Sequence, residues 1–492
     1  MSPLYVLMYH PKADGPGRMV EVRPEPMVAP DPAYRVAYLQ ASARVMDWLA
    51  QGARFDLSTA GAIRVWQGTR LVAAEAPSDG APGLAPDDCA YLGAYLVWQG
   101  CGWNQEMAGP AALPDDGPPR LRILHTEAAT SFGGQEYCIY KEMVAMRERG
   151  HHLEAVCQPR SELAVRLQQA GFIVHMLPMD GVANFWRTIA WIHRQLRRTP
   201  FDVIHTHSRR DTVLGAIAGH LARTPLIVRT RHLAKPIHSL YAYTWLAHGV
   251  IAVSDFVRRQ LLDGGASPDK VAMVHSPVES LSADGGGRVR RELGLSADTP
   301  VIGCVAAMRA DKGHHDLLDA FRRVVIRHPR ARLVLAGDGE PLLSLLRERA
   351  EALGLAGHVH FLGRREDIGD VMSAFDIFAL PTRREALGTV FIEAAGLGVP
   401  VIGGDVDGVP ETMLPGVSGL LVPPGDVPAL ARALARALDE LLDDPARRRA
   451  MGRMGRAYVE GGRFSPAVTA TQVEYVYLRW LAARGWRAGG RR

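Results

Sequence analysis

Two glutamates in the stretch from Leu380 to Glu411 stand eight positions apart, Glu385 and Glu393. A short turn between them opens a helix, and it consists of Ala386, Leu387, Gly388 and Thr389. The free N–H groups at the start of a helix attract phosphate. About two helical turns separate the carboxylates, so each can accept hydrogen bonds from a different set of hydroxyls. The stretch therefore predicts a binding site for a sugar diphosphate, in which one carboxylate contacts the sugar and the other contacts the ribose.

Glu385 and Glu393 also allow a purely structural interpretation. The helix dipole favours a carboxylate at the position of Glu385, and Glu393 could be a solvated helix residue. However, the sequence neighbours of Glu393 are apolar: Val390, Phe391, Ile392, Ala394 and Ala395. A charge within an otherwise buried face is unusual, which favours the functional interpretation.

A cationic pair, Arg309 and Lys312, occupies a second strand–turn–helix pattern, CVAAMRADKGHHDLLDAF. The helix dipole disfavours a basic residue at a helix start, which argues against the interpretation of this pair as an ordinary basic loop. Lysine is rare in this chain, whose 57 basic residues are nearly all arginine. The placement therefore indicates an anionic ligand beside the pair.

Glycines and histidines follow the strands of the first half of the chain. Gly133 and Gly134 precede a helix, where glycine permits close approach of the backbone to a ligand, although a Gly-Gly turn can also be simple punctuation. His205 and His207 share one face of the strand DVIHTHS, and His207 is nearer the strand end. We expect His207 to reach a ligand. The next strand ends in three basic residues that meet either an acceptor or only solvent: Arg229, Arg231 and His232.

Strands alternate with helices from Leu121 onwards. The first series contains RILHTE, LEAVC, IVHML, VIHTH, LIVRT and VIAVS, and a second begins at Val301 with VIGCVA, RLVLAG, VHFLG, IFALP, PVIGG and GLLVP. This alternation indicates two doubly wound parallel sheets, joined near residues 275–287. Such sheets bind ligands at the carboxyl ends of their strands, where all the residues named above stand.

These motifs, in this order over roughly residues 121–460, resemble the retaining GT-B glycosyltransferases of family 4, also called group 1. The resemblance implies an α/β fold with two Rossmann-like domains facing a cleft. It implies that Gly133 and Gly134 belong to the family's GG-x-E loop, and that His207 contacts the transferred sugar. Arg309 and Lys312 would hold the diphosphate and balance its charge as it leaves, and Gly363 would border the base. Glu385 would bind the sugar, Glu393 the ribose, and the backbone of residues 386–389 the phosphate or sugar.

Two departures from the family pattern stand out. Many relatives separate the Arg and Lys by about five positions, whereas here the gap is three, so Lys312 is the firmer assignment. HSPVES at His275 replaces an asparagine-glycine turn, which affects the domain linker rather than the chemistry.

The resemblance implies a retaining transferase that moves a sugar from a nucleoside diphosphate to a hydroxyl acceptor. His207, Glu385, Arg309 and Lys312 would act on the reacting groups, with no metal ion, cofactor or protein nucleophile. A lipid-linked glycan, a lipopolysaccharide core, a glycolipid or a small metabolite could be the acceptor. Alternatives on the same architecture are a nucleotide-sugar 2-epimerase, which needs no acceptor, and a noncatalytic scaffold.

The composition and charge of the chain limit the partners and the location of such an enzyme. The charge of +5 and pI of about 9.0 favour anionic partners, and the resemblance points to nucleotide sugars rather than nucleic acid. Five cysteines without a paired motif and an N-terminus without a signal sequence fit a cytoplasmic protein. The basic segment FWRTIAWIHRQLRR carries an apolar stripe that either packs on the sheet or rests on the inner face of an anionic membrane.

We expect four parts along the chain. Residues 1–118 would form a small α+β appendage of unknown role, with a helix from Tyr34 to Leu49 and strands around Ile63–Trp66 and Leu71–Ala74. Residues 119–280 would form the acceptor-side domain and residues 288–460 the nucleotide-sugar domain. Residues 461–492 would add a helix and a basic tail.

Overall fold

The computed structural model describes residues 119–237, 240–279, 281, 285–423, 427–460 and 463–486, and before them six strands together with Trp48 and Leu92. The Pro/Gly-rich residues 76–86 and 109–118 lie outside the described residues. The chain divides into two compact units, and the two large parallel sheets belong to different units. We call the part built on the first sheet the N-domain and the part built on the second the C-domain.

The six strands before residue 119 form two antiparallel sheets, in the orders β2-β1-β3 and β4-β5-β6. The strands are β1 (Leu4–Lys12), β2 (Gly15–Pro24), β3 (Arg35–Gln40), β4 (Arg54–Leu57), β5 (Ile63–Gln67) and β6 (Arg70–Ala74). The two predicted strands are thereby confirmed as β5 and β6. The helix predicted from Tyr34 is wrong over Arg35–Gln40, because RVAYLQ pairs with β1 as an antiparallel strand.

The N-domain is a seven-stranded parallel sheet in the order β13-β12-β11-β10-β7-β8-β9. Its strands are β7 (Arg122–Glu127), β8 (His152–Cys157), β9 (Ile173–Met176), β10 (Val203–Thr206), β11 (Leu226–Arg231), β12 (Gly249–Ala252) and β13 (Val271–Met273). Its helices are α3 (Gly134–Glu148), α4 (Glu162–Gln169), α5 (Val182–Arg198), α6 (Arg209–Ala222), η1 (Tyr241–Trp245), α7 (Asp255–Asp263), η2 (Pro268–Lys270) and α15 (Pro466–Ala483).

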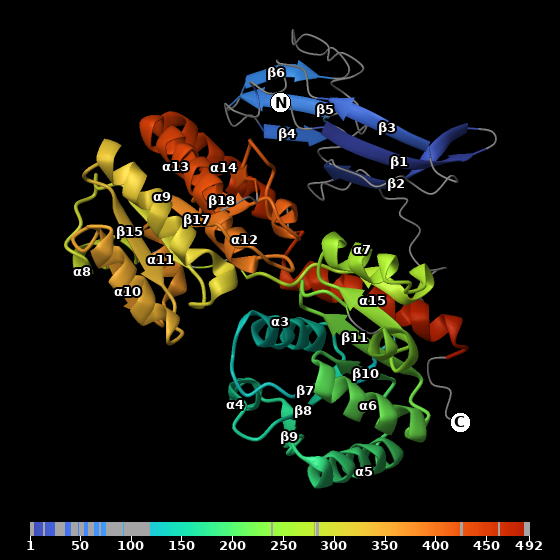
Figure 1. Ribbon diagram of the computed structural model, residues 1–492. Helices are drawn as coiled ribbons and strands as arrows, with labels where there is room; N and C mark the ends of the chain where they lie inside the picture. The colour runs from blue at the N-terminus through green and yellow to red at the C-terminus, as the bar shows by residue number, and fades with distance from the viewer. Residues whose placement is uncertain are drawn as a thin grey trace. The chain divides into compact units, whose positions relative to one another are not determined.

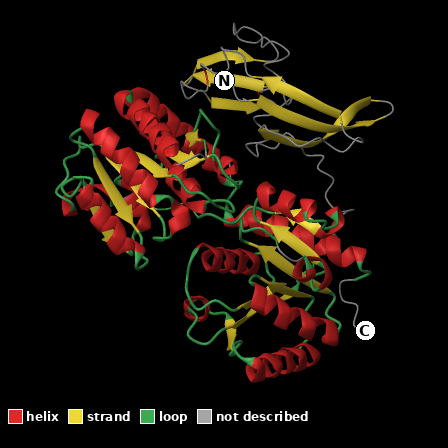
Figure 2. Ribbon diagram, viewed as in Figure 1, coloured by secondary structure: helices red, strands yellow, loops and turns green. Residues whose placement is uncertain are grey.

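Helices cover both faces of this sheet (Figures 1 and 2). Alternate strand residues enter opposite cores: Ile123 packs with residues of α3 and α15, whereas Leu124 packs with residues of α5 and α6. This is why the strands read as nearly continuous apolar runs. The apolar stripe of α5 also packs here, since Ile189, Ile192 and Leu196 are buried.

The C-domain is a six-stranded parallel sheet in the order β16-β15-β14-β17-β18-β19. Its strands are β14 (Val301–Val305), β15 (Arg332–Ala336), β16 (Val359–Gly363), β17 (Ile377–Leu380), β18 (Val401–Gly404) and β19 (Gly419–Val422). Its helices are α8 (Gly286–Glu292), η3 (Ala310–Lys312), α9 (His314–Arg327), α10 (Leu342–Ala352), α11 (Ile368–Ser373), α12 (Thr389–Gly396), η4 (Val409–Thr412), α13 (Val427–Asp443) and α14 (Pro445–Glu460).

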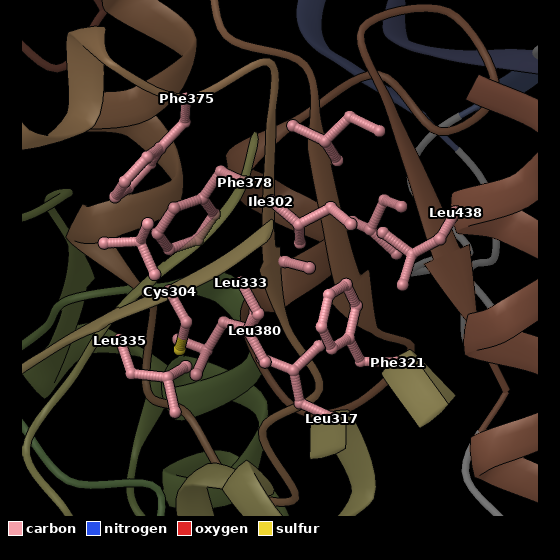
Figure 3. Close-up of a cluster of buried hydrophobic side chains, with 14 of the residues drawn as sticks. Ile302, Cys304, Leu317, Phe321, Leu333, Leu335, Phe375, Phe378, Leu380 and Leu438 are labelled. Atoms are coloured by element: carbon pink, nitrogen blue, oxygen red, sulfur yellow. The ribbon is translucent and has the colours of Figure 1, made fainter. Parts of the chain in front are cut away.

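The C-domain core lies between this sheet and its helices. Figure 3 shows strand residues such as Ile302 and Phe378 meeting Leu317 and Phe321 of α9 and Leu438 of α13. Close packing of this kind fixes the strand ends and the loops that leave them. Both predicted series of parallel strands are thus confirmed.

Candidate active site

In each domain the strand order reverses direction once, and the predicted site residues stand at that point. The reversal lies between β7 and β10 in the N-domain and between β14 and β17 in the C-domain. The loops at the carboxyl ends of two such strands diverge to opposite faces of the sheet, which leaves a crevice for a ligand. Lys312 follows β14, Glu385 follows β17, and His207 follows β10.

The loop that carries Lys312 is held by its neighbour from β17. The carbonyl of Asp311 accepts hydrogen bonds from Thr382 Oγ1 at 3.1 Å and from the backbone N–H of Arg383 at 2.8 Å. The Arg383 guanidinium also donates to the buried Asp316 carboxylate at 2.9 Å. These bonds fix the backbone around Lys312 without using the lysine itself.

Glycines let the C-domain loops approach one another closely. Gly313 has a φ of +72°, and a Cβ there would lie 2.1 Å from the carbonyl oxygen of Pro381. A Cβ at Gly337 would lie 1.9 Å from the carbonyl oxygen of Ala306. The N–H of Gly337 in turn donates to the carbonyl of Gly363 at 2.8 Å, so the predicted base-side residue belongs to the same loop cluster.

Positive charge collects at the start of α9. Arg309 is exposed and Lys312 is half-buried, just before the first turn of this helix. Burial, and then the neighbouring charge of Lys312, lower the pKa of His314 to about 4, so this imidazole is neutral at pH 7. Two cations and a helix N-terminus together form a favourable place for an anion. His314 was not predicted, because a histidine directly after a glycine carries no distinctive pattern.

The helix with the second glutamate begins at Thr389, as predicted. Gly388, directly before it, has a φ of +91°, which a glycine adopts at little cost. Glu385 and Glu393 are both half-buried, and Glu393 stands between the buried Ile392 and Ala394. This partial burial disfavours the interpretation of Glu393 as a fully solvated helix residue.

In the N-domain, His207 is buried between two other histidines. Its Nε2 lies 3.1 Å from Nδ1 of His125 on β7, and its Nδ1 lies 3.2 Å from Nε2 of His232 after β11. Its backbone N–H donates to the Asp211 carboxylate at 2.9 Å. The ring is therefore held firmly, by two histidine partners that the sequence did not predict.

His205 shares the face of His207, as predicted, with ring centroids 4.3 Å apart. Its Nδ1 lies 2.6 Å from the Tyr477 hydroxyl of α15 and 3.1 Å from the Glu142 carboxylate of α3. Its Nε2 lies 2.6 Å from Thr230 Oγ1. A partner 272 positions away cannot be found from local patterns, which is why this network was missed.

Burial keeps the imidazoles of His125, His207 and His232 neutral. It lowers the pKa of His125 and of His232 to about 3, and it holds the pKa of His207 well below its usual value. Among the described residues, His125, His205 and His207 form the group able to offer nitrogens within 4.8 Å of one another to a metal ion. His205 and His207 already use both ring nitrogens in hydrogen bonds, so a metal would have to displace these partners.

The predicted Gly133–Gly134 turn opens α3 and is exposed. The N–H of Gly133 donates to the Glu136 carboxylate at 2.8 Å. Beneath the turn, Glu127 at the end of β7 accepts from the amide of Gln135 at 2.6 Å. Burial, and then the charge of Asp211, raise the pKa of Glu127 to about 8. The polar run HTE at the end of a buried strand was the signal that could have revealed Glu127.

The basic end of β11 is not solvated. Arg229 and Arg231 are each only 5% exposed, and His232 is half-buried. Arg231 donates to the Tyr243 hydroxyl, the Lys235 carbonyl and the Gln260 side chain. The alternative of a solvated basic strand end is therefore wrong for Arg229 and Arg231, because Arg229 stacks on Tyr243 of η1 and Arg231 donates to residues of η1 and α7.

Known protein families match both domains. Residues 132–280 match the family model described as Glycosyltransferase Family 4, and residues 287–458 match the model described as Glycosyl transferases group 1. A D-inositol 3-phosphate glycosyltransferase of Corynebacterium efficiens is 30% identical over 308 residues, which cover 56% of this chain and 71% of that relative. The chain belongs to glycosyltransferase family 4.

Other known proteins are similar over a shorter stretch or at a lower identity. A GDP-mannose-dependent monoacylated alpha-(1-6)-phosphatidylinositol monomannoside mannosyltransferase of Corynebacterium glutamicum is 42% identical over 180 residues, which cover 35% of this chain and 45% of the relative. The match thus spans less than half of that relative's length. The HepE protein of Anabaena, whose structure contains UDP and glucose, shares the fold with a TM-score of 0.64 and 23% identity over 72% of this chain and 98% of HepE.

Proposed function

We propose that this chain is a retaining glycosyltransferase that moves a hexose from a nucleoside-diphosphate sugar to a hydroxyl acceptor, without a metal ion. The observation that carries the proposal is the Lys312 loop. Hydrogen bonds from the β17 loop hold it at the start of α9, where two cations and the helix dipole favour an anion. Membership of glycosyltransferase family 4 makes a nucleoside diphosphate the fitting anion.

Arg309 and Lys312 would stabilise the leaving diphosphate. Negative charge grows on the departing oxygen in the transition state, and fixed cations stabilise that charge more than they stabilise the intact donor. In this account the protein's own cations do the work that a divalent ion does in other transferases. Gly363 would border the base.

The two glutamates and His207 would hold the sugar. Glu385 would accept hydrogen bonds from sugar hydroxyls, Glu393 from the ribose, and the backbone of residues 386–389 would face the phosphate or sugar. The buried, neutral His207 would contact the transferred sugar as an uncharged partner. Attack and departure on one face of the sugar would retain its configuration without a protein nucleophile.

Two relatives suggest where to begin with substrates. The name of the Corynebacterium glutamicum relative specifies GDP-mannose, and the name of the Corynebacterium efficiens relative specifies D-inositol 3-phosphate. We therefore propose GDP-mannose as the first donor to test and a phosphoinositol compound, free or in a lipid, as the first acceptor. Glycolipid synthesis would be the corresponding role.

A donor panel tests this function. The chain is incubated with GDP-, UDP- and ADP-sugars in EDTA, with and without phosphatidylinositol vesicles, and the products are separated. We expect release of nucleoside diphosphate that depends on the acceptor. An isomerised donor sugar formed without acceptor would indicate the epimerase instead, and failure to bind any donor would indicate a scaffold.

Peripheral contact with an anionic membrane at its inner face is a second proposal, supported by the outer face of α5. Val182 and Trp186 are 79% and 60% exposed there, beside the exposed arginines Arg187, Arg194 and Arg197. Among the described residues, no helix has the length and apolar character needed to cross a membrane. Sedimentation with phosphatidylglycerol vesicles but not phosphatidylcholine vesicles, lost in Trp186→Ser, is the expected result; equal sedimentation with both would contradict it.

A further inference from the structure

Among the described residues of the N-domain, one buried arginine meets no acceptor for its charge. Arg229 is 5% exposed, and within the described part of the chain its guanidinium makes neither a hydrogen bond nor an ion pair. Its neighbour Arg231, equally buried, has three acceptors. A buried charge without a partner costs several kcal/mol in general, so such a group is expected to have a ligand.

The side chain of Arg229 is nevertheless held in place. Its guanidinium lies 3.8 Å from the centre of the Tyr243 ring, a stacking contact that fixes the plane of the group. Nε is fully buried without a hydrogen-bond partner, and the residue keeps 5% of its surface exposed. Stacking on one face leaves the N–H groups along the edge of the guanidinium free for an acceptor in its plane.

The carboxylate of Asp211 attracts the charge of Arg229 electrostatically, but no hydrogen bond or ion pair joins these two side chains. Burial lowers the pKa of Arg229, and Tyr243 and then Asp211 oppose this effect. The Asp211 oxygens already accept hydrogen bonds from the His207 N–H at 2.9 Å, Thr126 Oγ1 at 2.9 Å and the Ser208 N–H at 2.8 Å. These bonds fix the start of α6, and they leave Arg229 outside the network.

More positive charge adjoins Arg229. Arg209, the exposed first residue of the 14-residue helix α6, and Arg231 both lower the pKa of Arg229 further, so their charges lie close to it. The N-terminus of α6 adds its dipole. A buried unpaired guanidinium, a second arginine and a helix start thus adjoin the predicted sugar contact, His207.

We propose that Arg229 binds a phosphate group of the acceptor, with Arg209 as its exposed second contact. The inference rests on the proposed transfer to a phosphoinositol acceptor, and it assigns the residues that would hold the phosphate of that acceptor. An Arg edge matches two oxygens of a phosphate, and a phosphate supplies the charge that Arg229 lacks. Arg229 would thereby align the acceptor hydroxyl and select phosphorylated acceptors over neutral ones.

Phosphate binding can be measured without any sugar transfer. The titration uses the chain carrying Lys312→Gln, which silences the proposed diphosphate site, and adds inorganic phosphate at constant ionic strength. We expect phosphate to raise the unfolding temperature, and Arg229→Gln to weaken this effect at least tenfold. Arg210→Gln is the matched control, since Arg210 is an exposed α6 arginine paired with Asp180. An equal response in Arg229→Gln would overturn the proposal.

Two further comparisons exclude a merely structural arginine and a free-phosphate site. Without phosphate, Arg229→Gln should unfold at the same or a higher temperature, because an unpaired buried charge has been removed; a lower temperature would indicate a structural role and contradict the proposal. Inositol 3-phosphate should bind at least tenfold more tightly than inorganic phosphate, and inositol should not bind. Equal binding of the two phosphates would contradict the acceptor assignment while leaving the transferase proposal untouched.

Discussion

At the scale of single residues, Lys312 carries the prediction about the donor. Lys312→Ala removes an ammonium from the start of α9, and a charge-assisted hydrogen bond is worth about 1.5–3 kcal/mol. We therefore expect roughly 10- to 100-fold weaker binding of nucleoside diphosphate by calorimetry. Arg330→Ala is the control, since Arg330 is an exposed cation near the amino end of β15, paired with Asp298. Equal affinity in Lys312→Ala and the parent would remove Lys312 from the site.

Glu127 gives a prediction about pH. Its pKa is about 8 in the folded protein and 4.5 when unperturbed, so between these values the folded state holds a proton that the unfolded state has lost. Stability therefore falls as the pH rises from about 4.5 to 8, by about 1.4 kcal/mol per pKa unit at most. In Glu127→Gln this dependence disappears, and the Gln135 amide can turn to preserve the hydrogen bond. Unfolding temperatures of the parent and of Glu127→Gln at pH 5 and pH 9 test this prediction. An equal decrease between the two pH values in both proteins would disprove it.

At the scale of elements, the close approach of two loops depends on Gly313. A Cβ there would lie 2.1 Å from the Pro381 carbonyl oxygen, whereas a Cβ at Gly354 would meet nothing within 4 Å. Both glycines have similar φ values, +72° and +69°, so Gly354→Ala is a control for backbone strain alone. We expect Gly313→Ala to lower both the unfolding temperature and donor affinity clearly more than Gly354→Ala. Similar effects in the two variants would show that the loop contact is unimportant.

The elements themselves could be predicted from the sequence, and the side-chain networks only in part. Apolar runs such as VIGCV are local signals, and the structure bears them out. The Arg35–Gln40 strand was missed because a short apolar run fits a helix as well as a strand. The bond from His205 to Tyr477 and the isolation of Arg229 depend on residues brought together only by the fold.

At the scale of the whole molecule, the proposed function assigns donor binding and acceptor binding to different parallel sheets. In the proposed function, the C-domain would supply Arg309, Lys312 and Glu393 for the donor, and the N-domain would supply His207 for the sugar and Arg229 for the acceptor. Lys312 and His207 each follow a strand at the point where its own sheet reverses strand order, which is a property of parallel α/β sheets that the sequence pattern predicts. Side chains rather than the fold would then select the substrate.

The most direct test of the central claim is the configuration of the product. The full chain is incubated in EDTA with GDP-mannose and the other donors, with phosphatidylinositol vesicles, and proton NMR follows the anomeric signal. The account predicts that an α-configured donor gives an α-linked glycoside and free nucleoside diphosphate. A β-linked product, or transfer that occurs only when a divalent metal is restored, would contradict it.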